Sequence, residues 1–347
     1  MSINPLKLNG IEFVEFSASE PQKLHQLFLD FGFSRLMKHE TKNIDLYQQN
    51  DIVFLLNYEK GSFGDSFQKQ HGPSISSMGW RVEDSVFAMN KAVENGARPC
   101  ADGDYRFHGQ SVPAIFGIGD SLIYFVDKKE DEPVDYTQYG FVALQDPNRV
   151  ANKGFLMIDH LTNNVYKGTM AEWTRFYKEV FGFEEVRTFD IKGQKTGLQS
   201  YALRSPCGKF CIPINEADEA KSQINEYLDE YKGPGVQHLA FLTTDILESL
   251  DGLQGTSINM LDIDPSYYQT VFDRVPNVTE DKKKIEDLNV LVDGDDDGYL
   301  LQIFTKNLVG PIFIEIIERN NHLSFGEGNF QALFDSIERD QMKRGVL

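Results

Sequence analysis

Several features are scarce in this 347-residue chain, and each scarcity excludes a class of protein. Its cysteines are Cys100, Cys207 and Cys211, an odd count typical of reduced thiols in the cytoplasm and not of a disulfide framework. Cys207 and Cys211 lack a second pair, so no structural zinc site is predicted. No apolar run approaches the roughly 18 residues needed to cross a bilayer, and residues 1–9 lack the apolar core of a signal peptide. The sequence therefore predicts a cytoplasmic protein without a membrane segment.

Positive charge is also in short supply. The chain has 34 Lys and Arg residues against 53 Asp and Glu residues, which gives a net charge of −19. Contacts with a phosphate backbone need clustered Lys and Arg, so nucleic acid is excluded as a partner. What remains is ordinary for a globular protein, with 41% hydrophobic and 25% charged residues. The length predicts two or three domains with ample core.

A weak internal repeat indicates how the chain is organised. In one copy, residues 10–16 form a strand, and an amphipathic helix then runs from Pro21 to residues 31–33. In another copy, residues 156–161 form the strand, and the helix opens with a capping box that begins at Thr169. The repeat predicts that both copies continue into short strands.

Each half of the chain holds a second, looser copy of this unit. These copies open with strands at residues 75–80 and 236–241 and continue into helices at residues 85–95 and 245–253. We therefore predict an α+β fold with two domains, each made of paired strand–helix–strands units. The predicted domains are residues 1–150 and 151–347, divided within the polar stretch 128–153.

A glutamate in an otherwise apolar strand is the most informative feature of the sequence. It is Glu315, in the run Phe313-Ile314-Glu315-Ile316-Ile317. Both faces of this strand are predicted to be buried, where a bare carboxylate costs several kcal/mol unless it is paired or bound to a metal. Taken alone, Glu315 also fits a buried ion pair with Arg319 or Arg175.

Two histidines, His160 and His238, occupy similar apolar strands. A single strand histidine is usually a satisfied core residue, so neither predicts a ligand on its own. Their separation is 78 residues (238 − 160), and Glu315 follows after another 77 (315 − 238). If each unit opens with an equivalent strand, pseudo-symmetry brings the histidines together. Two histidines and a carboxylate form the facial triad that holds non-haem Fe(II) and leaves open positions.

The N-terminal copies carry other residues at roughly the histidine positions, namely Glu15 and Ser77. That half is therefore predicted to bind no metal and to act as a scaffold. A second acidic stretch, residues 293–298, begins like an EF-hand loop, but the twelfth position is Phe304 where such a loop needs Glu. It is better interpreted as a hairpin turn.

The C-terminal half resembles a known family, the 4-hydroxyphenylpyruvate dioxygenases. The resemblance rests on Gly233-Pro234-Gly235-Val236-Gln237-His238, Pro213-Ile214-Asn215-Glu216, residues 298–306, residues 313–319 and Phe325-Gly326-Glu327-Gly328-Asn329-Phe330. These motifs occur in family order between about residue 155 and the end of the chain, whereas the N-terminal half resembles the family only in outline. The family has the vicinal-oxygen-chelate (glyoxalase-like) fold of paired βαβββ units, which agrees with the repeat.

The resemblance implies a set of site residues. His160, His238 and Glu315 match the ligands of one Fe(II) per chain. The catalytic polar residues implied are Gln302, Gln237, Asn215 and Ser200. The substrate-pocket residues implied are Gln223, Phe304, Phe313, Phe325 and Phe330. Residues 329–347 match a C-terminal helix that covers the active site.

The resemblance further implies an activity. Such an enzyme converts 4-hydroxyphenylpyruvate and O₂ into homogentisate and CO₂, by oxidative decarboxylation, ring hydroxylation and side-chain migration, in tyrosine and phenylalanine catabolism. A 4-hydroxymandelate synthase is the nearest alternative, and Asn215 with the phenylalanine-rich pocket favours homogentisate. An extradiol ring-cleaving dioxygenase and a non-catalytic small-molecule-binding protein are further alternatives. A homo-oligomer with an interface in the N-terminal half is also expected from the family.

Overall fold

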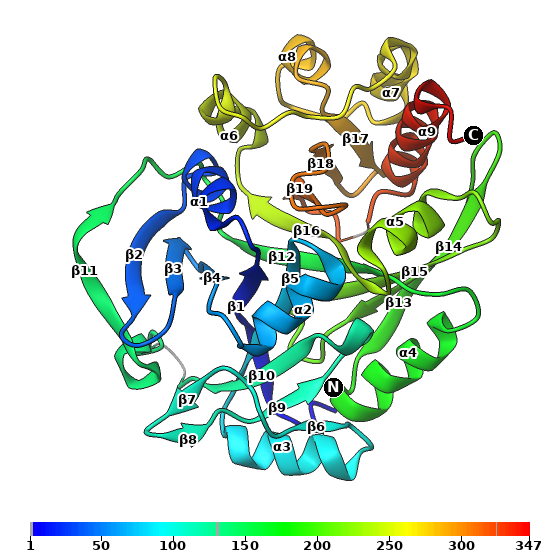
Figure 1. Ribbon diagram of the computed structural model, residues 1–347. Helices are drawn as coiled ribbons and strands as arrows, with labels where there is room; N and C mark the ends of the chain where they lie inside the picture. Colours follow the sequence, from blue (N-terminus) through cyan, green and yellow to red (C-terminus); the bar gives the residue numbers. More distant parts are fainter. Residues whose placement is uncertain (1–2, 130–131, 324) are drawn as a thin grey trace.

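The computed structural model describes residues 3–129, 132–323 and 325–347 (Figure 1). Residues 130–131, which belong to the predicted boundary stretch, lie outside the described residues, as do Met1, Ser2 and Ser324. The chain forms two large mixed sheets, one from each half, and helices pack against both (Figure 1).

The N-terminal half consists of two βαβββ units that share one sheet. The first unit is β1 (Leu8–Ser17), α1 (Pro21–Asp30), β2 (Ser34–His39), β3 (Ile44–Gln49) and β4 (Ile52–Asn57). The second is β5 (Ser74–Val82), α3 (Ser85–Glu94), β6 (Pro99–Cys100), β9 (Ala114–Phe116) and β10 (Leu122–Asp127). Additional elements are α2 (Phe63–His71), β7 (Arg106–Phe107), β8 (Gln110–Ser111), η1 (Ile118–Asp120), η2 (Tyr136–Tyr139) and β11 (Phe141–Asn148). The strand order is β11-β2-β3-β4-β1-β5-β10-β9-β6.

The C-terminal half repeats this plan. Its first unit is β12 (Met157–Asn164), α4 (Met170–Phe176), η3 (Tyr177–Phe181), β13 (Glu184–Lys192), β14 (Gly197–Arg204) and β15 (Cys211–Ala217). Its second is β16 (Gly235–Thr243), α6 (Ile246–Leu253), β17 (Leu291–Gly294), β18 (Tyr299–Phe304) and β19 (Phe313–Asn320). Additional helices are α5 (Gln223–Tyr231), η4 (Pro265–Tyr267), α7 (Tyr268–Arg274), α8 (Lys282–Asp287) and α9 (Glu327–Arg344). The order β13-β14-β15-β12-β16-β19-β18-β17 confirms the predicted paired units.

The helix starts follow local chemistry, with one exception. Asp84 and Asp245 each cap the helix that follows by accepting a backbone N–H three residues on. The predicted capping box at Thr169 is wrong, because the Thr169 hydroxyl donates to the carbonyl of Tyr166 and leaves α4 without a side-chain cap. This helix then widens into the π-helical η3, which ends at Gly182 in the left-handed conformation (φ 80°).

Aromatic rings join the two halves into a continuous core. Phe31 and Phe33 of the N-terminal half each meet Phe241 of β16 with ring centroids 5.8 Å apart. Phe33 also stacks on Phe54 at 4.3 Å. Such pairs contribute about 0.5–1.5 kcal/mol each beyond the area that they bury. The N-terminal half therefore supports β16, one of the strands that carry the site.

Three smaller features of the sequence can be placed in the structure. All three cysteines are free thiols. The stretch at residues 293–298 is the predicted hairpin turn, because β17 pairs antiparallel with β18 from Gly294 and Tyr299 onward. No helix of the described residues has the length and apolar character needed to cross a membrane.

The central strand pair of the C-terminal sheet, β12 with β16, relates the two histidines by pseudo-symmetry. Each histidine lies opposite the residue two positions after the other histidine: His160 faces Ala240, and His238 faces Thr162. This register agrees with the prediction that the two histidines are equivalent. Each strand also carries one bulged residue that the pairing skips, Asp159 in β12 and Gln237 in β16.

The N-terminal pair, β1 with β5, has the same two bulges and the same register between them, with a further irregularity between Leu8 and Ile11, and this register identifies the equivalent residues. Phe13 takes the place of His160 and Ser77 that of His238, while Tyr124 of β10 takes the place of Glu315. The expectation that Glu15 occupies a histidine position is wrong by two residues. The sequence likeness between the strands is too weak to set their register, which the hydrogen-bonded pairing fixes.

Candidate metal centre and pocket

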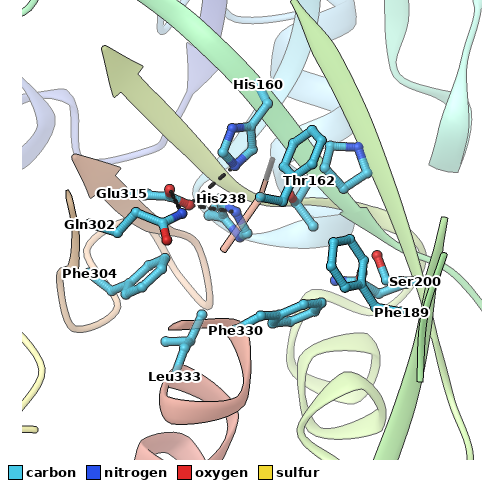
Figure 2. A pocket seen from close by; sticks show the side chains of 13 residues that line it. His160, Thr162, Phe189, Ser200, His238, Gln302, Phe304, Glu315, Phe330 and Leu333 are labelled. Carbon is cyan, nitrogen blue, oxygen red and sulfur yellow. Dashed lines mark hydrogen bonds and ion pairs between the residues drawn. The ribbon is translucent and has the colours of Figure 1, made fainter. Parts of the chain in front are cut away.

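Three adjacent strands bring the candidate ligands together. In the sheet, β16 lies between β12 and β19. His160, Ala240 and Glu315 form one row across these strands. The small side chain in the middle of the row leaves the space above it open, and His238 lies two residues along β16 from Ala240. Figure 2 shows both imidazole rings directed at the carboxylate.

The ligand atoms have the spacing that a bound metal ion requires. The Nε2 atom of His160 lies 3.2 Å from Oε2 of Glu315, and that of His238 lies 3.4 Å from the same oxygen. Adjacent donors at about 2.1 Å from a six-coordinate ion are about 3 Å apart. The triad offers one atom per residue, all within 4.8 Å of one another, and all three residues are buried. Nitrogen and carboxylate donors on one side fit a divalent first-row metal.

Glu315 is held as an anion. Burial favours its neutral form, but His160 and His238 outweigh this effect and hold the pKa of Glu315 well below its usual value. Burial lowers the pKa of His238. For His160, burial is outweighed by the carboxylates of Glu315 and Asp159, which raise its pKa. A metal ion would therefore displace a proton from this site, and its binding is expected to be pH-dependent.

The second oxygen of Glu315 has its own partner. The amide nitrogen Nε2 of Gln302 donates to Oε1 of Glu315 at 2.7 Å, which leaves Oε2 facing the histidines. The alternative partners considered from sequence lie elsewhere. Arg319 binds Asp159, and Arg175 is exposed on α4. The ion-pair interpretation of Glu315 is therefore wrong.

A narrow pocket lies over the triad. Its lining combines the triad with six of the other residues proposed from sequence, namely Gln302, Asn215, Ser200, Phe304, Phe325 and Phe330. Four further lining residues were not singled out from sequence: Thr162, Phe189, Pro213 and Leu333. Strand alternation carries a signal for two of them, because Thr162 follows His160 by two positions and Pro213 precedes Asn215 by two.

Three residues expected in the pocket lie around a neighbouring cavity instead: Gln223, Gln237 and Phe313. Two of them still contact a triad histidine. The ring of Phe313 stacks on His238 with centroids 4.7 Å apart. The side-chain oxygen of Gln237 lies 3.1 Å from Nδ1 of His238. Phe313 and Gln237 therefore contact His238 from outside the main pocket, and Gln223 lies in the neighbouring cavity at the start of α5.

The far side of the pocket is polar. Ser200 of β14 and Asn215 of β15 are direct partners across their strand pair. Nδ2 of Asn215 donates to Oδ1 of Asn164 at 3.2 Å. Among the described residues, Oδ1 of Asn215 is buried without a hydrogen-bond partner. A buried acceptor left unpaired costs about 1–3 kcal/mol, so this oxygen favours a ligand with a donor group.

The C-terminal helix α9 closes one side of the pocket. Phe330 and Leu333 extend from this helix toward the triad (Figure 2). Asn329, at the same end of α9, donates from Nδ2 to Oε1 of Gln302 at 2.8 Å. Gly326 precedes the helix at φ 65°, and a Cβ there would lie 2.6 Å from Oε1 of Gln302. Glycine is therefore required where the helix meets Gln302, which contacts the candidate ligand Glu315.

Comparisons with protein-family profiles cover both halves. Residues 3–141 match the family described as "Hydroxyphenylpyruvate dioxygenase, HPPD, N-terminal". Residues 157–303 match the "Glyoxalase/Bleomycin resistance protein/Dioxygenase superfamily". Together with the triad, these matches indicate a metal cofactor.

Full-length comparisons agree with the profiles. Protein MelA of Shewanella colwelliana is 61% identical over 345 residues, which covers 99% of each chain. A 4-hydroxyphenylpyruvate dioxygenase of Legionella pneumophila is 43% identical over 347 residues and covers 99% of this chain and 98% of that protein. A solved triple mutant of 4-hydroxymandelate synthase from Streptomyces coelicolor shares the fold, with a TM-score of 0.85, 23% identity and coverage of 96% of this chain and 99% of that chain. The chain belongs to the 4-hydroxyphenylpyruvate dioxygenase family.

Proposed function

We propose that this protein is an Fe(II)-dependent dioxygenase that converts 4-hydroxyphenylpyruvate and O₂ into homogentisate and CO₂ in tyrosine and phenylalanine catabolism. The proposal is supported by two full-length relatives named 4-hydroxyphenylpyruvate dioxygenase, which are 43% and 42% identical to this chain. The observation that carries it is the convergence of two imidazole nitrogens and one carboxylate oxygen at one end of a buried, phenylalanine-lined pocket.

His160, His238 and Glu315 would hold one Fe(II) per chain. Their donor set fits this ion and leaves the side toward the pocket open. Bound Fe(II) supplies the redox chemistry between O₂ and the substrate, which side chains alone cannot provide. The chain keeps Glu315 ionised through its two histidines and orients it through Gln302.

The pocket fits a substrate with an acidic end and a phenolic end. Ser200 lies across the pocket from Glu315 (Figure 2), and the unpaired oxygen of Asn215 is beside it. An elongated aromatic 2-oxo acid would place its acidic end at the triad and its phenol at these two residues. Phe304 and Phe330 would hold the ring between the two ends and exclude water.

The two halves would have different roles. We propose that residues 1–150 form a domain that acts as a scaffold, while residues 151–347 form the catalytic domain. The side chains at the triad-equivalent positions of the first half, Phe13, Ser77 and Tyr124, do not form a metal-binding set. A cytoplasmic location, in keeping with the free thiols, and a homo-oligomer complete the proposal.

Anaerobic loading with Fe(II), followed by addition of 4-hydroxyphenylpyruvate and O₂ and identification of the product, tests the function. Homogentisate with one CO₂ per turnover is expected. 4-Hydroxymandelate would reassign the protein as the synthase, and ring cleavage of a catechol without CO₂ would reassign it as an extradiol enzyme. His160→Ala should abolish turnover. His108→Asn is the matched control, because His108 is exposed at φ 48°, a conformation that Asn tolerates.

The binding-protein alternative is tested with the same variants. A protein that only sequesters the ligand would bind 4-hydroxyphenylpyruvate equally well with and without Fe(II), and His160→Ala would leave that affinity intact. Under the proposed function, His160→Ala weakens ligand binding in the presence of Fe(II) under anaerobic conditions. Calorimetric titration of the wild type and both histidine variants distinguishes these outcomes.

A further inference from the structure

In each triad histidine, Nδ1 forms a hydrogen bond with the side chain of the residue that precedes the histidine in the sequence. Nδ1 of His160 lies 2.7 Å from Oδ2 of Asp159, and Nδ1 of His238 lies 3.1 Å from Oε1 of Gln237. Consecutive side chains in a regular strand point to opposite faces and do not meet in this way. Asp159 and Gln237 are the bulged residues of their strands, and a bulge re-aims the side chain of the extra residue.

The two partners differ in charge and in support. Gln237 is neutral, whereas Asp159 is a carboxylate held by a two-pronged contact with Arg319. Nε of Arg319 donates to Oδ1 of Asp159 at 2.7 Å, and Nη2 donates to Oδ2 at 2.8 Å. Both side chains are 13% exposed. Charge-assisted, bidentate contacts of this kind fix orientation as well as adding energy.

Arg319 is fixed in turn by the strand that carries the carboxylate ligand. It lies on β19, four residues after Glu315, and its Nη1 donates to the carbonyl of His322 at 3.1 Å. The chain from Arg319 through Asp159 to His160 therefore connects two of the strands that supply ligands. A shift of β19 relative to β12 would disturb the ring orientation and the carboxylate ligand together.

We propose that Asp159, clamped by Arg319, is a positioning residue for the metal ligand His160. By accepting a hydrogen bond from Nδ1–H, the carboxylate keeps the proton on that nitrogen and leaves the lone pair of Nε2 directed at the ion. It also prevents rotation of the ring and makes the imidazole a stronger donor than that of His238. This inference rests on the proposed metal site and adds to it a reason for the unequal surroundings of the two histidines.

The N-terminal half provides an internal comparison. Glu12 occupies the bulge equivalent to Asp159 and also contacts a buried arginine, with Nε of Arg81 at 2.5 Å from Oε2. The residue after it is Phe13, which has no ring nitrogen to orient. Glu12 instead accepts a hydrogen bond from the hydroxyl of Tyr136 at 3.0 Å. The carboxylate–arginine pair thus occurs at both bulges, and only the C-terminal copy is directed at a histidine.

Cobalt binding tests the proposal without turnover. The metal-free protein is titrated with Co(II), its visible spectrum is recorded, and Kd is measured by competition with a chelator. Asp159→Ala is expected to raise Kd by about 10- to 100-fold and to shift the Co(II) bands. Asp159→Asn, which keeps an acceptor oxygen, is expected to lie between the wild type and Asp159→Ala.

A double variant covers the case in which an unpaired Arg319 prevents folding. Asp159→Ala with Arg319→Met removes both charges and is expected to show the same weakened Co(II) binding. Glu12→Ala is the matched control, because it breaks the equivalent bulge pair and should leave Kd within twofold of the wild type. A folded double variant with wild-type Kd and spectrum would overturn the inference.

The controls separate this inference from the proposed function. If the wild type bound no Co(II), or if His160→Ala bound it as tightly as the wild type, the proposed metal site would itself be wrong. If the wild type bound Co(II) and His160→Ala did not, an unchanged Kd on removal of Asp159 would refute only the positioning role.

Discussion

Glu338 is expected to be the main anchor that keeps α9 over the pocket. Its side chain is 2% exposed and accepts hydrogen bonds from the backbone N–H groups of residues 194–196 at 2.7–3.0 Å. The hydroxyl of Thr196 adds a fourth bond at 3.0 Å. These contacts fasten the helix that carries Phe330 and Leu333 to the hairpin between β13 and β14.

The magnitude follows from the charge of the acceptor. Hydrogen bonds to a charged group contribute about 1.5–3 kcal/mol each, but the loop is rehydrated when the helix leaves, so the contributions do not add in full. We expect Glu338→Ala to destabilise the state in which α9 covers the pocket by about 2–4 kcal/mol. The fraction of molecules in which α9 has left the pocket would then rise on the order of 30- to 1,000-fold.

Hydrogen exchange followed by mass spectrometry measures this effect. In Glu338→Ala, the amides of α9 and of residues 194–196 should exchange faster by that factor, and KM should rise. Glu327→Gln is the control on the same helix, because its contact with Arg187 at 2.8 Å is exposed and contributes about 0–1 kcal/mol. Exchange in Glu338→Ala that stayed within threefold of the wild type would refute the anchoring role.

The same anchor has a pH dependence of known sign. Burial favours the neutral acid, but the hydrogen bonds from Gln194, Lys195 and Thr196 outweigh it and lower the pKa of Glu338 below the ordinary 4.5. The contribution of Glu338 to the stability of the closed helix is therefore complete above pH 4.5, and it is lost as the pH falls through the lowered pKa of Glu338. Protection of α9 should be insensitive to pH between 6 and 8.

Three further predictions concern single side chains. Glu315→Gln removes the anionic donor of the triad and should raise the Kd for Fe(II) by more than about 100-fold, with an unchanged far-UV circular dichroism spectrum; tight binding by this variant would contradict the ligand set. Burial raises the pKa of Glu15 from 4.5 to about 7, so the folded state favours the neutral acid. The resulting contribution to the free energy of unfolding is complete below pH 4.5 and is lost as the pH rises through 7. Relative to Glu15→Gln, the wild type should lose about 3 kcal/mol of stability between pH 5 and pH 8, measured by urea unfolding; parallel pH profiles would exclude this assignment. Asn215→Ala should lower kcat/KM for 4-hydroxyphenylpyruvate about 3- to 10-fold and leave that for phenylpyruvate unchanged; equal losses for both would show that Asn215 does not bind the phenol.

The units and the triad could be predicted because their signals are local or regularly spaced. The strand–helix–strands pattern can be seen in apolar periodicity, and the 78-residue interval from His160 to His238 is the spacing between the opening strands, β12 and β16, of two successive units. Neither signal requires knowledge of strand pairing. The fold class and the approach of the two histidines to one another therefore followed from the sequence, whereas Glu315, on the closing strand β19, was identified by its carboxylate in an apolar strand and by the family motif.

The details that depend on register could not be predicted in this way. Simple alternation places Asp159 on the face opposite His160, and only the bulge brings the two side chains together. The same irregularity moves Gln237 behind His238 instead of into the main pocket. The role of Arg319 is equally hidden, because its partner lies 160 residues earlier in the chain.

The strands of both halves have the same bulge, at Glu12 in β1 and at Asp159 in β12. The backbone geometry of the site therefore does not depend on which side chains it holds. Reactivity lies in a few exchangeable side chains mounted on a frame that both halves possess. In the N-terminal half, Phe13 and Tyr124 occupy the positions equivalent to His160 and Glu315 and pack in a buried cluster with ring centroids 6.1 Å apart, so the same frame can hold either a polar site or an apolar core.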